Sequence, residues 1–190
     1  MRKARDASLA VKAGRIMKTA VMIISQEMFR DEELLHTKEA LERNGIGVKI
    51  ASTELSEAKG KLGAKVMPDM LFKDINLKDF DAIIFVGGPG SLRYWHDPLA
   101  HKLLKEAFSS GKVCAGICAA SATLAHAGIL RGKRSTVFPG DSRELVDNGA
   151  NYTASHLEKD GLVITADGPY AAYNFGEEIA KTLREGMGDK

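Results

Sequence analysis

The sequence of 190 residues predicts an α/β fold, a doubly wound sandwich with a mostly parallel central sheet. Short apolar runs such as AIIFV at 82–86 lack polar alternation, which is typical of parallel strands covered on both faces. Charged segments with apolar residues at helical spacing separate these runs. Because strands alternate with helices, we expect any functional site at the carboxyl ends of the strands.

The first half of the sequence contains two clear strands, a helix between them and one weakly patterned stretch. A strand is predicted over 19–25, where apolar residues follow one another, and a helix over 31–44, which a glycine ends. A second strand is predicted over 48–51. The stretch 58–65 is rich in Gly and Lys, and 66–72 predicts short extended pieces of an accessory hairpin.

The second half repeats the alternation of strand and helix. The predicted strand 82–86 ends in the glycine cluster 87–90, and a helix is predicted over 97–110. A short strand, 113–117, runs directly into Cys118 and a small-residue helix that ends at Gly128. Further strands are expected at 136–138, 152–155 and 162–165, with helices over 143–148 and from about 171 to 184.

Charge divides the chain into two unequal parts. The formal net charge is +2, but residues 1–17 carry +4 and the remainder carries −2. We predict a basic N-terminal extension over 1–17, disordered or not native, and a single domain over 18–190. The extension has no aromatic residue for stacking or interfacial anchoring, so we expect neither a nucleic-acid nor a membrane partner.

The two cysteines, Cys114 and Cys118, indicate a reducing compartment. An extended chain would separate them by about 13 Å, which excludes a disulfide between them in that geometry. With no disulfide framework and no signal-peptide pattern, we predict a cytoplasmic protein. No apolar run approaches the roughly 20 residues of a membrane-spanning helix.

Three predicted strands are followed by residues that could carry chemistry. Cys118 lies at a strand-to-helix turn, where N–H groups and the helix dipole are expected to lower its pKa below about 8.5. It is therefore a candidate nucleophile, whereas Cys114, inside the strand, is predicted to be a core residue. Glu33 follows the first strand, and Gly88 belongs to a cluster that forms a tight turn, an oxyanion site or both.

The chain is similar to a known family in several motifs that occur in a fixed order: FRDEEL at 29–34, FVGGPG at 85–90 and AGICAAS at 115–121, then AGILRGK, FPG and EKDGLVITADGP. Together they resemble the ThiJ/PfpI superfamily of class I glutamine amidotransferase-like proteins, over about residues 18–186. This group includes deglycases and archaeal intracellular proteases.

The resemblance implies a flavodoxin-like sandwich in which Cys118 is held in a strained elbow as the nucleophile. Glu33 would be a protonated carboxyl group that donates a hydrogen bond to the thiolate, while Asp31 and Glu32 are expected only to place negative charge in a first helical turn. The backbone N–H groups of Gly88 and Ala119 would bind an oxyanion on the substrate. The resemblance also implies a homodimer or higher oligomer.

The sequence departs from the protease branch at Ala119, where that branch has a histidine after the nucleophile. Peptide hydrolysis also needs a proton donor for the leaving amine, so this substitution argues against proteolysis. His126 is predicted to lie roughly 12 Å along the helix from Cys118, out of reach. His36, His96 and His101 are expected to be solvated. The five histidines form no metal-ligand pattern, so no metal and no cofactor are predicted.

Three functions are compatible with these residues. The leading hypothesis is a cysteine-dependent enzyme, similar to glyoxalases and deglycases, that acts on small reactive carbonyl compounds through Cys118 and Glu33. The second is a redox-responsive stress or chaperone-like protein in which Cys118 becomes a sulfinate. The third is an intracellular cysteine peptidase or amidase. The pocket walls are expected to come from residues 58–72 and 92–98 and from a neighbouring subunit. Trp95 fits a place in the pocket, at an interface or in simple packing equally well.

Overall fold

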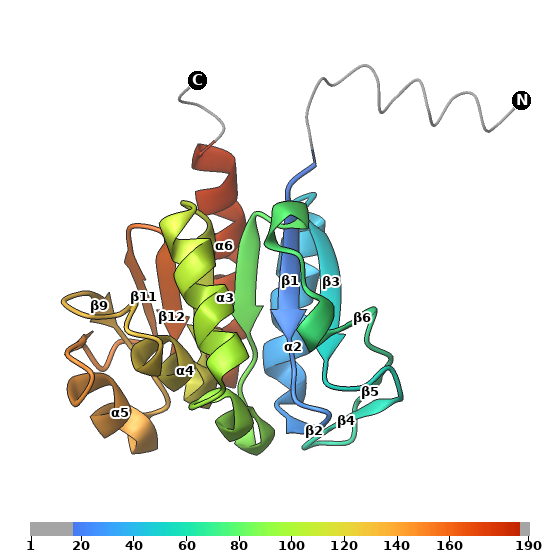
Figure 1. Ribbon diagram of the computed structural model, residues 1–190, viewed down its shortest axis with the longest axis horizontal. Coiled ribbons are helices and arrows are strands. Elements are labelled where there is room, and N and C mark those ends of the chain that lie inside the picture. The colour runs from blue at the N-terminus through green and yellow to red at the C-terminus, as the bar shows by residue number, and fades with distance from the viewer. Residues whose placement is uncertain (1–16, 187–190) are drawn as a thin grey trace, which may run out of the picture.

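The computed structural model describes residues 17–186, so the predicted basic extension lies outside the described residues except for its last one. A seven-stranded sheet forms the centre, in the order β11-β12-β8-β7-β1-β3-β6, and only β11 runs antiparallel to its neighbour (Figure 1). Its strands are β1 Thr19–Ile23, β3 Gly47–Ser52, β6 Met70–Leu71, β7 Ala82–Phe85, β8 Val113–Ile117, β11 Leu157–Asp160 and β12 Val163–Ala166.

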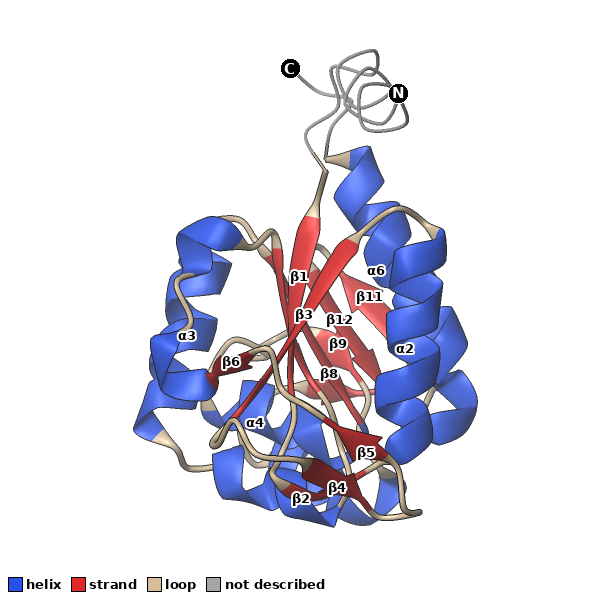
Figure 2. Ribbon diagram, turned by 90° about the vertical axis from the view of Figure 1, so that its right-hand side faces the viewer, coloured by secondary structure: helices blue, strands red, loops and turns tan. Residues whose placement is uncertain are grey.

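Helices cover both faces of this sheet (Figure 2). Helices α2 (Asp31–Arg43) and α6 (Ala172–Glu185) pack on one face, and α3 (Pro98–Ser109) and α4 (Ser121–His126) pack on the other. The central strands β7 and β8 are buried along their whole length, because each contributes side chains to both helical layers. The predicted α/β sandwich with a mostly parallel sheet is therefore confirmed.

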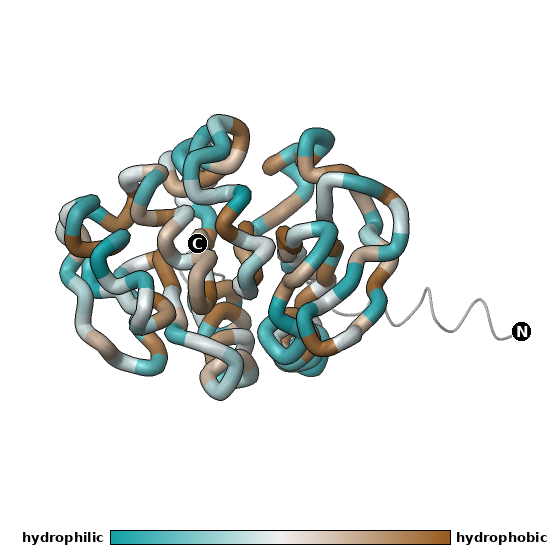
Figure 3. Tube along the Cα trace, turned by 90° about the horizontal axis from the view of Figure 1, so that it is seen from below, coloured by the Kyte–Doolittle hydropathy of each residue, from teal (hydrophilic) through white to brown (hydrophobic). Residues whose placement is uncertain are grey.

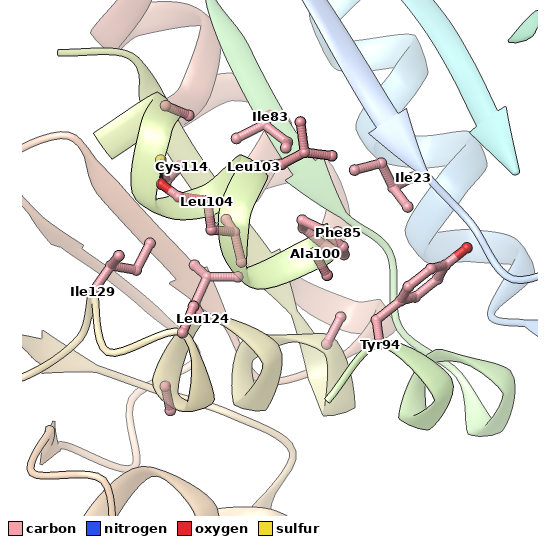
Figure 4. Close-up of a cluster of buried hydrophobic side chains, with 14 of the residues drawn as sticks. Ile23, Ile83, Phe85, Tyr94, Ala100, Leu103, Leu104, Cys114, Leu124 and Ile129 are labelled. Atoms are coloured by element: carbon pink, nitrogen blue, oxygen red, sulfur yellow. Dashed lines mark hydrogen bonds between the residues drawn. The ribbon is translucent and has the colours of Figure 1, made fainter. Parts of the chain in front are cut away.

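The α3 side of the sheet contains a close-packed apolar cluster that fixes the ends of the central strands. Phe85 and Tyr94 lie edge to face, with ring centroids 5.7 Å apart, and the buried Tyr94 hydroxyl donates to the Ile24 carbonyl at 2.9 Å. Cys114 lies in the same cluster, next to Leu104 (Figure 4). This rigid layer holds the carboxyl ends of β7 and β8 in place.

Two small sheets flank the central sheet, one beyond its carboxyl edge and one beside β11. One consists of β2 (Glu27–Phe29), β4 (Ala58–Gly60) and β5 (Lys65–Val66), and the other of β9 (Arg134–Ser135) and β10 (Asn151–Tyr152), next to helix α5 (Ser142–Val146). They lie toward opposite ends of the central sheet in Figure 1. Figure 3 shows the molecule from below, where hydrophilic and hydrophobic segments alternate along the loops.

Several predicted boundaries were wrong in these peripheral segments. The hairpin expected over 66–72 forms instead between β4 and β5, and β6 pairs with β3 and joins the central sheet. Residues 136–138 are not a strand, because the Thr136 N–H donates to the Thr165 hydroxyl at 2.9 Å instead of to a ladder carbonyl. Strands β2 and β11 were not predicted, since both are short and β11 is also rich in charged residues.

The remaining helix predictions hold to within a few residues. The small-residue segment after Cys118 begins as a 3₁₀ turn, Cys118–Ala120, and becomes α-helical only from Ser121. Within residues 17–186, no helix has the length and apolar character needed to cross a bilayer.

Candidate active site

Cys118 lies at a sharp elbow between β8 and the 3₁₀ turn that precedes α4. Its φ is +58°, a left-handed conformation that costs a non-glycine residue on the order of 1–3 kcal/mol. Close packing holds the elbow: a side chain at Gly116 would lie 3.0 Å from the Ser121 Cα, and the Ser121 hydroxyl donates to the Gly116 carbonyl at 2.9 Å. The expected strained elbow is therefore present.

Gly87, directly after β7, is the point where Glu33 and Cys118 meet. A Cβ atom at Gly87 would lie 2.7 Å from the Cys118 Cβ and would also overlap the Glu33 carboxyl group. The next residue, Gly88, has φ +99° and packs against the backbone of Met28 and Arg30. The two glycines are thus required for close approach, which brings a residue from α2 next to one from the end of β8.

Glu33 is fully buried in the first turn of α2. Neither of its carboxyl oxygens has a hydrogen-bond partner among the described residues. Burial raises its pKa to about 7, an effect that the nearby Cys118 thiol and Gly87 N–H partly oppose. Glu33 is therefore partly protonated near neutral pH, and its carboxyl group is free to exchange a proton with a neighbour.

The two other acids of this first turn have partners of their own. Asp31 accepts the backbone N–H groups of Leu62 and Ala64, at 2.8 and 2.6 Å, and so closes the turn between β4 and β5. Glu32 forms a two-point ion pair with Arg30, at 2.8 and 3.1 Å. Of the three adjacent acids, only Glu33 faces Cys118 without a partner of its own.

The predicted low pKa of Cys118 was wrong. Burial is the main cause that raises the thiol pKa, to about 12, and the negative charge of Glu33 adds to it. The N–H groups of Ala119 and Gly88 act in the opposite direction. Protonation of Glu33 removes this repelling charge and turns the carboxyl group into a hydrogen-bond donor, while burial, the larger cause, still favours the thiol.

A pocket of about 350 Å³ opens above Cys118 and Glu33. The sequence did not identify several of its wall residues, because they come from loops that are distant in the chain. Its lining also includes Gly88 and Ala119, as expected, and then Arg30, Lys61, Pro89, Leu92, Phe138, Asp141 and Pro169. The short FPG motif was the only signal for the wall around Phe138.

None of the five histidines lines this pocket. His126 bonds to Glu144 at 2.8 Å, and His156 to Asp167 at the same distance. His101 was expected to be solvated, but it is half-buried, with its ring nitrogen 2.6 Å from the Trp95 carbonyl. Trp95 itself donates to the Ala119 carbonyl at 2.9 Å and so supports the elbow. In residues 17–186, no three His, Cys, Asp or Glu side chains gather as metal ligands.

Comparison with known proteins gives a consistent match. The DJ-1/PfpI family pattern matches residues 18–182. A deglycase of Pyrococcus abyssi is 32% identical over 86% of this chain and 99% of its own length, and a glutathione-independent glyoxalase of Caenorhabditis elegans is 31% identical over 87% and 89%. The crystal structure of a ThiJ/PfpI domain protein from Brachyspira murdochii superposes with a TM-score of 0.87 at 29% identity, covering 90% of this chain and 99% of that one.

Proposed function

This chain belongs to the DJ-1/PfpI family, and on that premise we propose that it is a cysteine-dependent enzyme that acts on small reactive carbonyl compounds. Cys118 is the nucleophile and Glu33 is the acid–base group. The observation that carries the proposal is the meeting of these two side chains across Gly87, at a pocket that reaches both. The deglycase and glyoxalase names of the relatives support the same substrate class.

In the first step, the Glu33 carboxylate takes the Cys118 thiol proton, and the sulfur attacks the aldehyde carbon of an α-oxoaldehyde such as methylglyoxal. A C–S bond forms, and the electron pair of the carbonyl moves to its oxygen. The N–H groups of Gly88 and Ala119 donate hydrogen bonds to this oxyanion, a task that needs only backbone. The oxyanion then takes the proton of Glu33, which gives a neutral hemithioacetal and a carboxylate.

In the second step, the Glu33 carboxylate removes the hydrogen of the former aldehyde carbon as a proton. The electrons move toward the second carbonyl, and an enediolate forms. Return of this proton to the second carbon, with transfer of the hydroxyl proton of the first carbon to the oxygen of the second, gives the thioester of a 2-hydroxy acid. Water then hydrolyses the thioester, which releases the hydroxy acid and restores the Cys118 thiol. The net change is an internal redox isomerisation plus water, so no external oxidant is required.

Turnover of methylglyoxal to lactate tests the proposal. We expect Cys118→Ser to lower kcat/KM by at least about a thousandfold and Glu33→Gln by about a hundredfold, because nucleophilic attack and proton transfer are lost in turn. Cys114→Ser is the matched control and is expected to retain most of the activity. Equal turnover by Cys118→Ser and the unmodified chain would contradict the assignment of the nucleophile.

The peptidase hypothesis receives no support from this site, because Ala119 replaces the expected histidine and none of the described histidines faces Cys118. Oxidation of Cys118 to a sulfinate stays a prediction, which mass spectrometry after mild peroxide treatment would test. Assembly as a homodimer or higher oligomer and a cytoplasmic location also stay predictions. Light scattering of the purified chain would test the oligomeric state.

A further inference from the structure

Asp141 occupies an unusual place for an aspartate at the start of a helix. It precedes α5, where a carboxylate normally accepts the first N–H groups of the helix, but its side chain makes no such bond. It also forms no hydrogen bond or ion pair with any other side chain in the described part of the chain. Instead, Asp141 lines the pocket that contains Cys118.

The charges around this pocket leave two groups without a counter-ion. Arg30 is neutralised by its two-point pair with Glu32. Lys61 is exposed and forms no ion pair within residues 17–186. Asp141 is the only acid besides Glu33 in the pocket lining, and burial together with the nearby Glu144 raises its pKa, which is the direction expected when no cation stabilises the carboxylate.

Lys61 and Asp141 come from opposite sides of the carboxyl edge. Lys61 follows β4 in the three-stranded small sheet, whereas Asp141 lies between β9 and α5. Charges that line a cleft with low-dielectric walls act strongly on a charged ligand, because the field lines are focused into the cleft. Beside the Arg30–Glu32 pair and the Glu33 carboxyl group, a substrate that enters this pocket therefore meets one unpaired negative charge at Asp141 and one unpaired positive charge at Lys61.

We propose that Asp141 is a specificity-determining residue that disfavours carbonyl compounds bearing a carboxylate, with Lys61 acting in the opposite sense. This inference rests on the proposed carbonyl chemistry for the choice of substrates. Neutral oxoaldehydes such as methylglyoxal are accepted without penalty. Anionic ones such as glyoxylate are repelled by Asp141 before they reach Cys118.

A labelling experiment tests the charge selection without any turnover. Iodoacetamide is neutral and iodoacetate is anionic, and both alkylate the same thiolate. The ratio of their rates at Cys118 is therefore independent of the thiolate fraction. We expect Asp141→Asn to raise the iodoacetate to iodoacetamide ratio about fivefold and Lys61→Gln to lower it by a similar factor, with both effects shrinking in high salt.

The matched control is Asp147→Asn, which makes the same charge change at an exposed residue just beyond α5 that does not line the pocket. It is expected to leave the ratio unchanged. Asp141→Glu keeps the charge and should also keep the ratio near that of the unmodified chain. An unchanged ratio in Asp141→Asn, or the same rise in Asp147→Asn, would overturn the proposal.

Turnover gives a second readout. In Asp141→Asn, kcat/KM for glyoxylate relative to methylglyoxal should rise about fivefold. If the unmodified chain converts neither aldehyde, the proposed function fails while the alkylation ratio still decides the role of Asp141. If methylglyoxal is converted and neither ratio responds to Asp141→Asn, the proposed function stands and the inference about Asp141 fails.

Discussion

Cys114 lies near the start of β8 and Cys118 directly after its end, four residues apart, yet their surroundings differ in kind. Cys114 is fully buried in the apolar layer under α3, and burial alone raises its pKa to about 12. Cys118 has a pKa raised to a similar value, but a carboxyl group and two backbone N–H groups share in setting it. The two thiols therefore differ in access, since only Cys118 lines a pocket, and in having a neighbour that can supply or remove a proton.

The largest expected difference between the two cysteines is in alkylation rate. Cys118 is reached through its pocket, whereas Cys114 can react only when the sheet and α3 separate, an opening that requires most of the free energy of unfolding. We expect iodoacetamide at pH 8 to label Cys118 about a thousandfold faster or more, as followed by peptide mass spectrometry. Comparable rates at both residues would contradict the difference in accessibility.

Gly87 has no side chain, and this lets the Glu33 carboxyl group approach Cys118, whereas Cys114 has no such neighbour. A methyl group there would overlap the carboxyl group and approach the Cys118 Cβ to 2.7 Å. We expect Gly87→Ala to destabilise the chain by about 2–4 kcal/mol and to lower turnover at least tenfold. Gly111→Ala is the control: it has φ +69° but no atom within 4 Å, so it should cost only about 1 kcal/mol and spare activity.

The pH dependence of stability should also distinguish the surroundings of Cys118, which include the titrating Glu33, from those of Cys114. Because the pKa of Glu33 is raised to about 7 on folding, the folded state binds more protons than the unfolded state between about pH 4.5 and 7. Stability contributed by protonated Glu33 is complete below this window and falls by up to about 3 kcal/mol as the pH rises through it. Cys114 contributes nothing there, because unfolded thiols titrate only near about pH 8.5.

Urea unfolding at a series of pH values measures this slope. Glu33→Gln should flatten the curve between pH 5 and 8, while Cys114→Ser should leave its shape unchanged. A slope that persists in Glu33→Gln would assign the titration to another group.

The sequence predicted the core of the site but only part of its walls. Cys118 could be placed because an apolar strand followed by small residues indicates a tight strand-to-helix turn. The residues alone did not distinguish Glu33 from Asp31 and Glu32, since all three share one helical turn and only their tertiary partners separate them. Lys61 lies in the predicted wall segment 58–72, although its role was not identified, and Asp141 was missed because its loop carries no periodicity and only long-range packing brings it to the pocket.

The smallest predicted effect is the difference in stability between a glycine and an alanine variant, which should have opposite signs at positions 118 and 114. At position 118 the positive φ favours glycine, so Cys118→Gly should be more stable than Cys118→Ala by about 1 kcal/mol. At position 114, in the middle of the sheet, Cys114→Ala should be more stable than Cys114→Gly by a similar amount, because glycine weakens a strand and leaves a larger cavity. Denaturant midpoints of the four variants measure both differences. A preference for alanine at both positions would mean that the positive φ at position 118 costs no stability, and the elbow would then hold Cys118 beside Glu33 without strain.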